Sequence, residues 1–247
     1  MTRIAAVGDI HVGADSVGRV AAGLAHVGER ADVLLLAGDL TRCGSVAEAE
    51  LVAAEVAGAT IPVVAVLGNH DLHADQGTEV VATLAGAGIT VLDGTSTTVA
   101  AGGVVLGIAG AKGFGGGFAG ACASAFGERA MKAFVEETRQ EAARLHDALV
   151  GLRDRADRRV ALLHYSPVEA TLRGERREIY PFLGSHLLAE AVDTAGADLV
   201  VHGHAHNGSE RGVTPGGIPV RNVAQPVIRH AYRVFDLAVR AVDRSVA

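Results

Sequence analysis

Short apolar runs alternate with amphipathic segments over much of the chain. Each run is rich in Val, Leu, Ile or Ala and ends at a glycine or a polar residue, which predicts strands that are covered on both faces. The five runs are Arg3–Val7, Asp32–Ala37, Ile61–Leu67, Arg159–Leu163 and Asp198–Val201. Between the first three, Val17–Arg30 and Ser45–Ala57 carry apolar residues at helical spacing, and Ser45 with Glu48 forms a capping box. This order predicts right-handed βαβ crossovers and an open, mostly parallel sheet.

The middle and the end of the chain follow other patterns. Ile89–Leu92, Thr97–Ala100 and Val104–Ala109 are separated by turn dipeptides, which predicts an antiparallel meander. A long helix is expected from about Glu128 to Leu152, and further strands are expected at Pro219–Val223 and Ile228–Leu237. No internal repeat or linker divides the chain, so residues 1–247 are expected to form a single domain.

Composition narrows the class of protein. With 49% hydrophobic and 20% charged residues, the chain is expected to be globular and ordered. Aromatic residues make up 4%, Trp is absent and the net charge is −6, so stable binding to nucleic acid is not expected. Cys43 and Cys122 make no disulfide framework, and no run resembles a signal peptide or a membrane span. A cytoplasmic protein without membrane association is expected, and its oligomeric state stays open.

Polar residues of one chemical kind follow each of the five predicted strands. The blocks are Gly8-Asp9-Ile10-His11, Gly38-Asp39, Gly68-Asn69-His70-Asp71, His164-Tyr165-Ser166-Pro167 and His202-Gly203-His204-Ala205-His206. Six of the eleven histidines lie in these blocks. Because open α/β sheets bind ligands at the carboxyl ends of their strands, the blocks are expected to meet at one place.

These residue types indicate metal binding. Carboxylate, imidazole and amide oxygen suit Mn, Fe or Zn, and the lack of thiolates argues against a structural zinc site. In each of the pairs Asp9/His11 and His204/His206, one residue separates the two members. An extended chain would therefore place both members of a pair on one side. One ion could not accept all of these groups, whereas two ions that share a carboxylate could. Two divalent cations with only two aspartates leave positive charge for a hydroxide and an anionic substrate, as in a two-metal phosphoesterase.

The ordered blocks resemble the signature of the calcineurin-like metallophosphoesterase superfamily: D-x-H, G-D, G-N-H-[DE], H and G-H-x-H. Here they are Asp9-Ile10-His11, Gly38-Asp39, Gly68-Asn69-His70-Asp71, His164 and Gly203-His204-Ala205-His206. Five blocks in order across nearly the whole chain are far more specific than one. The resemblance implies an α/β fold, the four-layer α/β/β/α sandwich of that superfamily.

The resemblance also implies roles. Asp9, His11 and His206 would hold one metal ion, Asn69, His164 and His204 the second, and Asp39 would bridge them. The cofactors would be two divalent ions (Mn, Fe or Zn), with Mn favoured. A hydroxide between them would attack phosphorus, His70 would assist the leaving group, and Asp71 would orient His70 and raise its pKa.

Residues outside the blocks are weaker candidates. His202 is expected to be a buried structural histidine. The stretch Lys112–Gly120 lacks the Walker pattern and is expected to be a flexible flap rather than a phosphate loop. Arg42, Lys112 and Tyr180 are candidate substrate contacts, although a surface charge explains Arg42 equally well and exposure is the stronger explanation for Tyr180.

The predicted function is hydrolysis of a small-molecule phosphodiester or phosphomonoester. A cyclic nucleotide is one such substrate, whereas a nuclease or a phosphoprotein phosphatase has less support in the sequence. The alternative is a non-catalytic scaffold or protein-binding module with the same fold. Scaffold members tend to lose the histidine at the position of His70, which this chain keeps.

Overall fold

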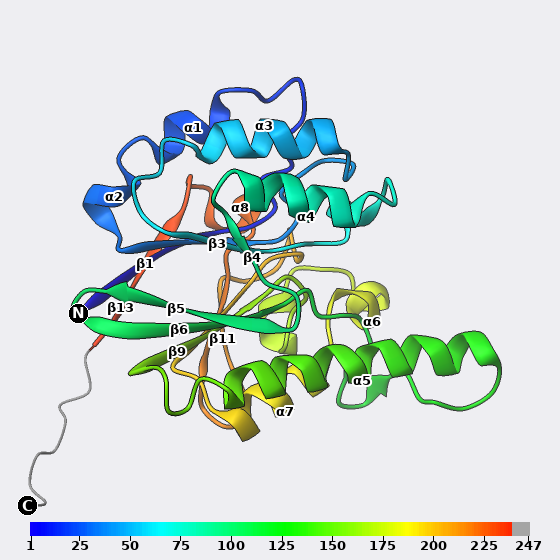
Figure 1. Ribbon diagram of the computed structural model, residues 1–247. Helices are drawn as coiled ribbons and strands as arrows, with labels where there is room; N and C mark the ends of the chain where they lie inside the picture. Colours follow the sequence, from blue (N-terminus) through cyan, green and yellow to red (C-terminus); the bar gives the residue numbers. More distant parts are fainter. Residues whose placement is uncertain (239–247) are drawn as a thin grey trace, which may run out of the picture.

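Two β-sheets pack face to face in the computed structural model, which describes residues 1–238 (Figure 1). The first sheet has the order β13-β1-β2-β3-β4 and the second the order β11-β12-β10-β9-β6-β5. Helices α1 to α4 cover the outer face of the first sheet, and α5 and α7 cover that of the second (Figure 1). The predicted four-layer α/β/β/α sandwich is therefore confirmed.

The first sheet is parallel except for β13, which runs antiparallel to β1. Its strands are β1 (Thr2–Val7), β2 (Val33–Ala37), β3 (Val63–Val66), β4 (Thr90–Val91) and β13 (Arg233–Leu237). The helices along it are α1 (Arg19–Leu24), α2 (Val27–Arg30), α3 (Val46–Val56) and α4 (Gly77–Gly86). As the capping box predicts, the Ser45 hydroxyl accepts a hydrogen bond from the Glu48 amide at the start of α3.

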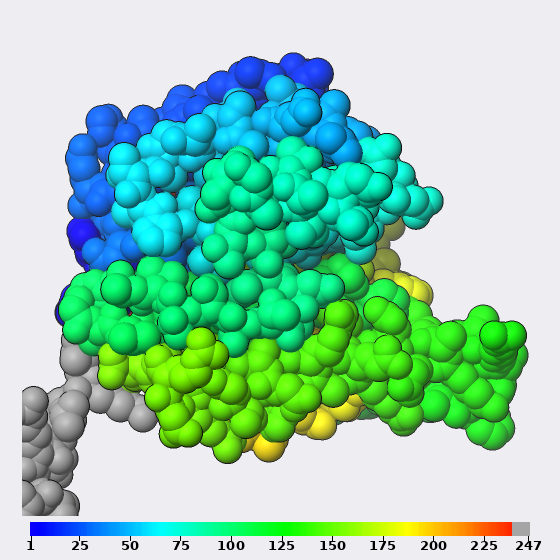
Figure 2. All heavy atoms as spheres, in the orientation of Figure 1, coloured from blue at the N-terminus to red at the C-terminus, as the bar shows by residue number. Residues whose placement is uncertain are grey.

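The second sheet has a parallel centre, β6-β9-β10-β12, and antiparallel edges. Its strands are β5 (Thr95–Ala101), β6 (Val104–Ala111), β9 (Arg158–Leu163), β10 (Leu199–His202), β11 (Arg211–Val213) and β12 (Pro219–Asn222). The remaining elements are β7 (Gly117–Phe118), β8 (Ala121–Cys122), α5 (Arg129–Val150), α6 (Tyr180–Leu183), α7 (His186–Ala195), α8 (Gln225–Ile228) and the 3₁₀ turns η1 (His70–Leu72), η2 (Glu169–Leu172) and η3 (Arg177–Ile179). The start of α5 projects beyond the rest of the molecule (Figure 2).

Side chains that alternate between the two faces of the second sheet contribute to two hydrophobic cores. On β9, Val160 and Leu162 pack between the sheets, whereas Ala161 and Leu163 face α5 and α7. Both sets are completely buried, which explains why the strand is apolar at every position from Val160 to Leu163. The five strands predicted from apolar runs are all present, and burial on two faces fixes the strand ends on which the polar blocks sit.

Two predictions about the middle and end of the chain are wrong. The run Ile89–Leu92 does not join an antiparallel meander, because its strand β4 pairs in parallel with β3 in the other sheet. Of the three runs, only the two that become β5 and β6 pair as a hairpin. The run Ile228–Leu237 is not one strand, because α8 ends at Ile228 and β13 begins at Arg233. Local patterns show turns but do not show which sheet a strand joins.

The Gly-rich stretch is held by the protein rather than free to move as a flap. The Gly113 amide donates to the buried carboxylate of Glu141, the Gly116 amide donates to the Pro181 carbonyl, and Thr138 donates to the Gly115 carbonyl. Phe118 is buried. The amides of Gly113 and Gly116 therefore already have partners and are not free to bind a phosphate.

In the described part of the chain, no helix combines the length and apolar character that a bilayer span requires.

Candidate metal centre

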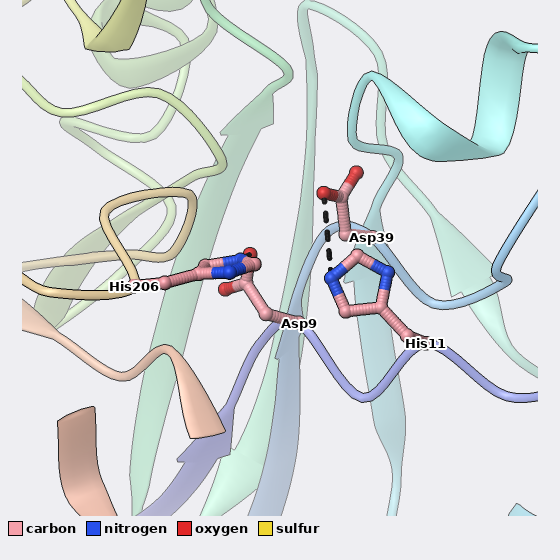
Figure 3. A group of neighbouring side chains, drawn as sticks. All are labelled: Asp9, His11, Asp39 and His206. Atoms are coloured by element: carbon pink, nitrogen blue, oxygen red, sulfur yellow. Dashed lines mark hydrogen bonds and ion pairs between the residues drawn. The ribbon is translucent and has the colours of Figure 1, made fainter. Parts of the chain in front are cut away.

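The polar blocks meet where the ends of β1, β2 and β3 face those of β9 and β10. Nitrogen and carboxylate atoms that could bind metal form two groups, and within each group the atoms lie within 4.8 Å of one another. One group is Asp9, His11, Asp39 and His206; the other is Asp39, His164 and His204. Figure 3 shows the first, with the side chains converging from three segments far apart in sequence. Asp39 belongs to both groups, as a bridging ligand must.

Distances between side chains define the two halves. In the first, His206 Nε2 lies 2.8 Å from Asp9 Oδ1, and His11 Nε2 lies 3.9 Å from Asp39 Oδ2. In the second, His164 Nε2 lies 3.3 Å from Asp39 Oδ1 and 3.0 Å from Asn69 Oδ1. The structure therefore brings together all seven residues predicted as metal ligands.

Contacts behind the ligands orient the histidines of the second half. His164 Nδ1 lies 2.9 Å from the Ala37 carbonyl, so it carries the proton and leaves Nε2 directed at Asp39. His204 Nε2 lies 3.2 Å from the Phe182 carbonyl, which leaves Nδ1 for an ion. Hydrogen bonds of this kind fix the tautomer of a metal-binding histidine.

The donor atoms fit divalent cations. Both ring nitrogens of His11 are buried and find no hydrogen-bond partner within residues 1–238, which is costly unless something absent from the protein chain binds there. Burial lowers the pKa of His11 and lowers that of His204 to about 3, so both rings are neutral and able to coordinate. Burial opposes charge on His164 too, but the adjacent Asp39 carboxylate raises the pKa of His164 to about 9. A cation would replace that proton.

The backbone at the ligands is left-handed, which corrects one prediction. Asp9, His11 and His204 have φ of 58°, 42° and 68°, so the paired ligands are not displayed by an extended chain. Asp39, with φ of 50°, shares this conformation. Residues other than glycine rarely adopt this backbone conformation, and the strain it causes concentrates at functional sites. A Cβ atom on Gly68 would collide with the Asp39 carboxylate, and one on Gly203 would collide with that of Asp9, so glycine is required at both positions.

His70 lies beside the Asp39 carboxylate without joining either group. Its amide donates to Asp39 Oδ1 at 2.8 Å, and its Nε2 lies 4.0 Å from Asp39 Oδ2. Its ring centroid is 4.6 Å from that of His11. His70 Nδ1 lies 2.8 Å from the Arg42 carbonyl, an acceptor that requires a proton on Nδ1. His70 therefore presents Nε2 to the site.

Asp71 does not orient the His70 ring, contrary to the prediction. Its buried carboxylate accepts hydrogen bonds from the amides of Leu40, Thr41 and Gly68 and from the Thr41 hydroxyl, at 2.6–3.2 Å. The Arg42 carbonyl makes the contact that was expected of Asp71. Burial raises the pKa of Asp71 itself. Asp71 therefore joins the loop after β2 to the loop after β3.

We expect Asp71→Asn to destabilise the protein more than it changes its chemistry. The amide keeps one acceptor oxygen but points an NH₂ group at backbone donors, which should cost about 1–3 kcal/mol. Calorimetry should show a lower Tm while metal content stays close to that of the wild type. If Asp71→Asn has an unchanged Tm and a large loss of turnover, the assignment to loop anchoring is wrong.

The three candidate substrate contacts lie in different surroundings. Arg42 lines a cavity together with Asp9 and His11 and forms an ion pair with Asp15 at 2.5 Å. Lys112 is partly buried in a separate cavity beside α4 and α5, where its ammonium donates to the Gly113 carbonyl and lies over the Phe114 ring. The Tyr180 hydroxyl donates to the Leu172 carbonyl. Of these three, Arg42 alone shares a cavity with the metal ligands.

Sequence patterns missed two aromatic residues beside the second half of the site. The Tyr165 ring centroid lies 4.3 Å from that of His204, and burial raises the pKa of Tyr165 to about 12. Phe182 holds His204 through its carbonyl, yet 60% of the residue is exposed. Tyr165 directly follows the predicted ligand His164, so its place in the sequence could have indicated a position at the site. No sequence pattern indicates that Phe182 lies there. The prediction for His202 is confirmed: it is buried, with Nε2 2.9 Å from the Thr171 hydroxyl.

Known structures share this fold at low sequence identity. Phosphopantetheinyl hydrolase (PptH) from Mycobacterium tuberculosis matches with a TM-score of 0.67 and 15% identity over 99% of this chain and 97% of that chain. The protein TT1561 of Thermus thermophilus matches with a TM-score of 0.57 and 19% identity, covering 90% and 88%. GAP50, described as the anchor in the inner membrane complex of Plasmodium, matches with a TM-score of 0.57 and 11% identity, covering 91% and 72%. These likenesses show the fold alone.

Sequence comparison identifies the family. No curated protein matches the chain. The family model described as calcineurin-like phosphoesterase matches residues 2–208, which include every block of the signature. The chain therefore belongs to the calcineurin-like phosphoesterase family.

Proposed function

We propose that the protein is a two-metal hydrolase that cleaves a phosphoester bond in a small molecule. The observation that carries the proposal is the pair of ligand groups that share Asp39, together with the two buried ring nitrogens of His11, which have no hydrogen-bond partner among the described residues. Two divalent ions, with Mn favoured, would supply an activated water and neutralise charge on the phosphate when bound. Asp9, His11 and His206 would hold one ion and Asn69, His164 and His204 the other.

His70 is proposed to assist the leaving group. Its Nδ1 donates to the Arg42 carbonyl, so a proton on Nε2 makes the ring a cation that can give that proton to the leaving oxygen. The main chain of His70 is fixed by Asp39, which keeps the ring over the site. The Asp39 carboxylate therefore has two proposed tasks: it bridges the two ions, and it holds the main chain of the proton donor His70.

A non-catalytic scaffold is the competing function, and GAP50 shows that a protein of this fold can be described as an anchor. Against it, this chain has all seven ligand residues and His70 in one place. The backbone strain at four of these ligands supports the same conclusion, because strain is retained where a site needs it.

Turnover of simple esters tests the proposal. Protein stripped of metal and reconstituted with Mn²⁺ is expected to hydrolyse bis(p-nitrophenyl) phosphate or p-nitrophenyl phosphate, and chelation should abolish the reaction. Cyclic nucleotides, mononucleotides and sugar phosphates then rank natural substrate classes. Absence of turnover above buffer with Mn²⁺, Fe²⁺, Zn²⁺ and Co²⁺, in protein shown to be folded, would favour the scaffold.

A further inference from the structure

A cavity of about 550 Å³ opens directly beside the first half of the metal centre. Asp9 and His11 form one part of its wall. The opposite part comes from the end of the chain, from Gln225 to Ala231, which lies outside the residues 2–208 matched by the family model. A volume of this size suits a small-molecule site, and the cavity is continuous with the predicted metal ligands.

Three arginines line this cavity although the protein has a net charge of −6. They are Arg19 at the start of α1, Arg42 after β2 and Arg229 at the end of α8. Arg42 is paired with Asp15, and among the described residues of the lining Asp9 is the only acidic one. Within residues 1–238, neither Arg19 nor Arg229 has a side-chain hydrogen bond or an ion pair, although Asp15 also interacts electrostatically with Arg19. Both arginines are exposed, so their guanidinium groups can reach a ligand.

Backbone contacts fix the arginine of α8 relative to the metal ligands. The Gly8 amide donates to the Val223 carbonyl at 2.9 Å, and the Gln225 amide donates to the Gly8 carbonyl at 3.0 Å. Gly8 directly precedes the ligand Asp9. In Figure 3, a salmon ribbon from the late part of the chain passes on the Asp9 and His206 side of the site. Arg229 itself is the capping residue directly after α8 and has φ of 53°, a costly conformation for an arginine.

We propose that Arg19, Arg42 and Arg229 bind a second phosphate of the substrate, separate from the phosphate that is cleaved. This inference rests on the proposed function and names its substrate class: phosphoesters that carry a further phosphate on the part next to the Asp9 half of the centre. Guanidinium groups are suited to this task, because their planar donors match phosphate oxygens. The second phosphate sets affinity and selectivity, whereas the metal centre and His70 act on the first.

Two chromogenic substrates that differ only in the second phosphate test the proposal. They are thymidine 5′-(p-nitrophenyl phosphate) and the same compound with a 3′-phosphate. Two exposed arginines acting together should give the 3′-phosphorylated compound an advantage of about tenfold in kcat/KM, mainly through KM, and the advantage should shrink with salt. In Arg19→Gln/Arg229→Gln, the ratio between the two substrates should fall towards one.

The control is Arg139→Gln/Arg155→Gln, which removes the same charge from exposed positions away from the cavity. It should retain the wild-type ratio. Calorimetric titration with thymidine 3′,5′-bisphosphate and thymidine 5′-monophosphate measures the same preference without turnover. The bisphosphate should bind the wild type about tenfold more tightly and lose that preference only in the cavity variant.

Failures of the two proposals give different results. Equal kcat/KM for both substrates and equal affinity for both nucleotides would overturn the second-phosphate site and leave the hydrolase intact. A preference for the bisphosphate without hydrolysis of any ester would overturn the hydrolase and leave the anion site. A ratio that falls equally in the control variant would show a general charge effect and would also overturn the inference.

Discussion

Asp39→Asn is expected to remove the metal ions and the activity together. Asp39 Oδ1 lies 3.3 Å from His164 Nε2 and Oδ2 lies 3.9 Å from His11 Nε2, so the two oxygens serve different halves of the centre. The carboxamide keeps one oxygen, which can still accept the His70 amide, but it loses the negative charge and the second oxygen. Turnover with Mn²⁺ should fall by on the order of 10³-fold or more.

Elemental analysis of the purified protein, together with the ester assay, measures both effects. The matched control is Asp147→Asn on α5, whose side chain is 82% exposed, and it should retain metal and activity. Circular dichroism should show that Asp39→Asn is folded. Two ions bound to Asp39→Asn at wild-type affinity would contradict the bridging role.

The sequence predicts those features that depend on one strand and the residues directly after it. Apolar runs such as Arg3–Val7 and Asp198–Val201 identify buried strands because both faces of each sheet are covered. Since parallel strands end at one edge, the residues that follow them, such as Asp9 and His204, could be expected to meet. The order of the blocks and the chemistry of their residues were therefore enough to predict which side chains meet at the candidate metal centre.

The rest depends on contacts between distant segments. The partners of Asp71 are backbone amides of Leu40, Thr41 and Gly68, and amides carry no sequence signature. Arg229 lies 220 positions after Asp9 in the numbering, yet lines the same cavity because backbone hydrogen bonds join Gly8 to Val223 and Gln225. Folding places α8 there, and no local pattern could predict it.

The proposed reaction and the proposed choice of substrate depend on different parts of the chain. The predicted metal ligands all lie inside the family match, whereas the cavity beside them is lined in part by Gln225–Ala231, outside it. If both proposals hold, residues inside the family match carry the reaction and Gln225–Ala231 contribute to the choice of substrate. This is the reason to test Arg229 separately from the centre itself.

His70→Ala is expected to keep the metal ions and lose most of the rate. The His70 amide, not its ring, donates to Asp39, and alanine preserves that hydrogen bond. The variant loses only the imidazole, whose Nδ1 is anchored on the Arg42 carbonyl and whose Nε2 faces the site. Loss of a positioned proton donor should reduce kcat by about 10²- to 10⁴-fold.

The choice of leaving group distinguishes proton donation by His70 from a packing effect. If His70 protonates the leaving oxygen, the defect should be largest for esters of simple alcohols and smallest for p-nitrophenyl esters, because p-nitrophenolate leaves without a proton. His73→Ala is the matched control, since the His73 ring centroid lies 4.4 Å from that of His70 and, within residues 1–238, His73 belongs to neither group of predicted ligands. It should keep both metal content and leaving-group dependence. An equal defect of His70→Ala on both kinds of ester, with both ions still bound, would leave charge stabilisation as its role and exclude proton transfer.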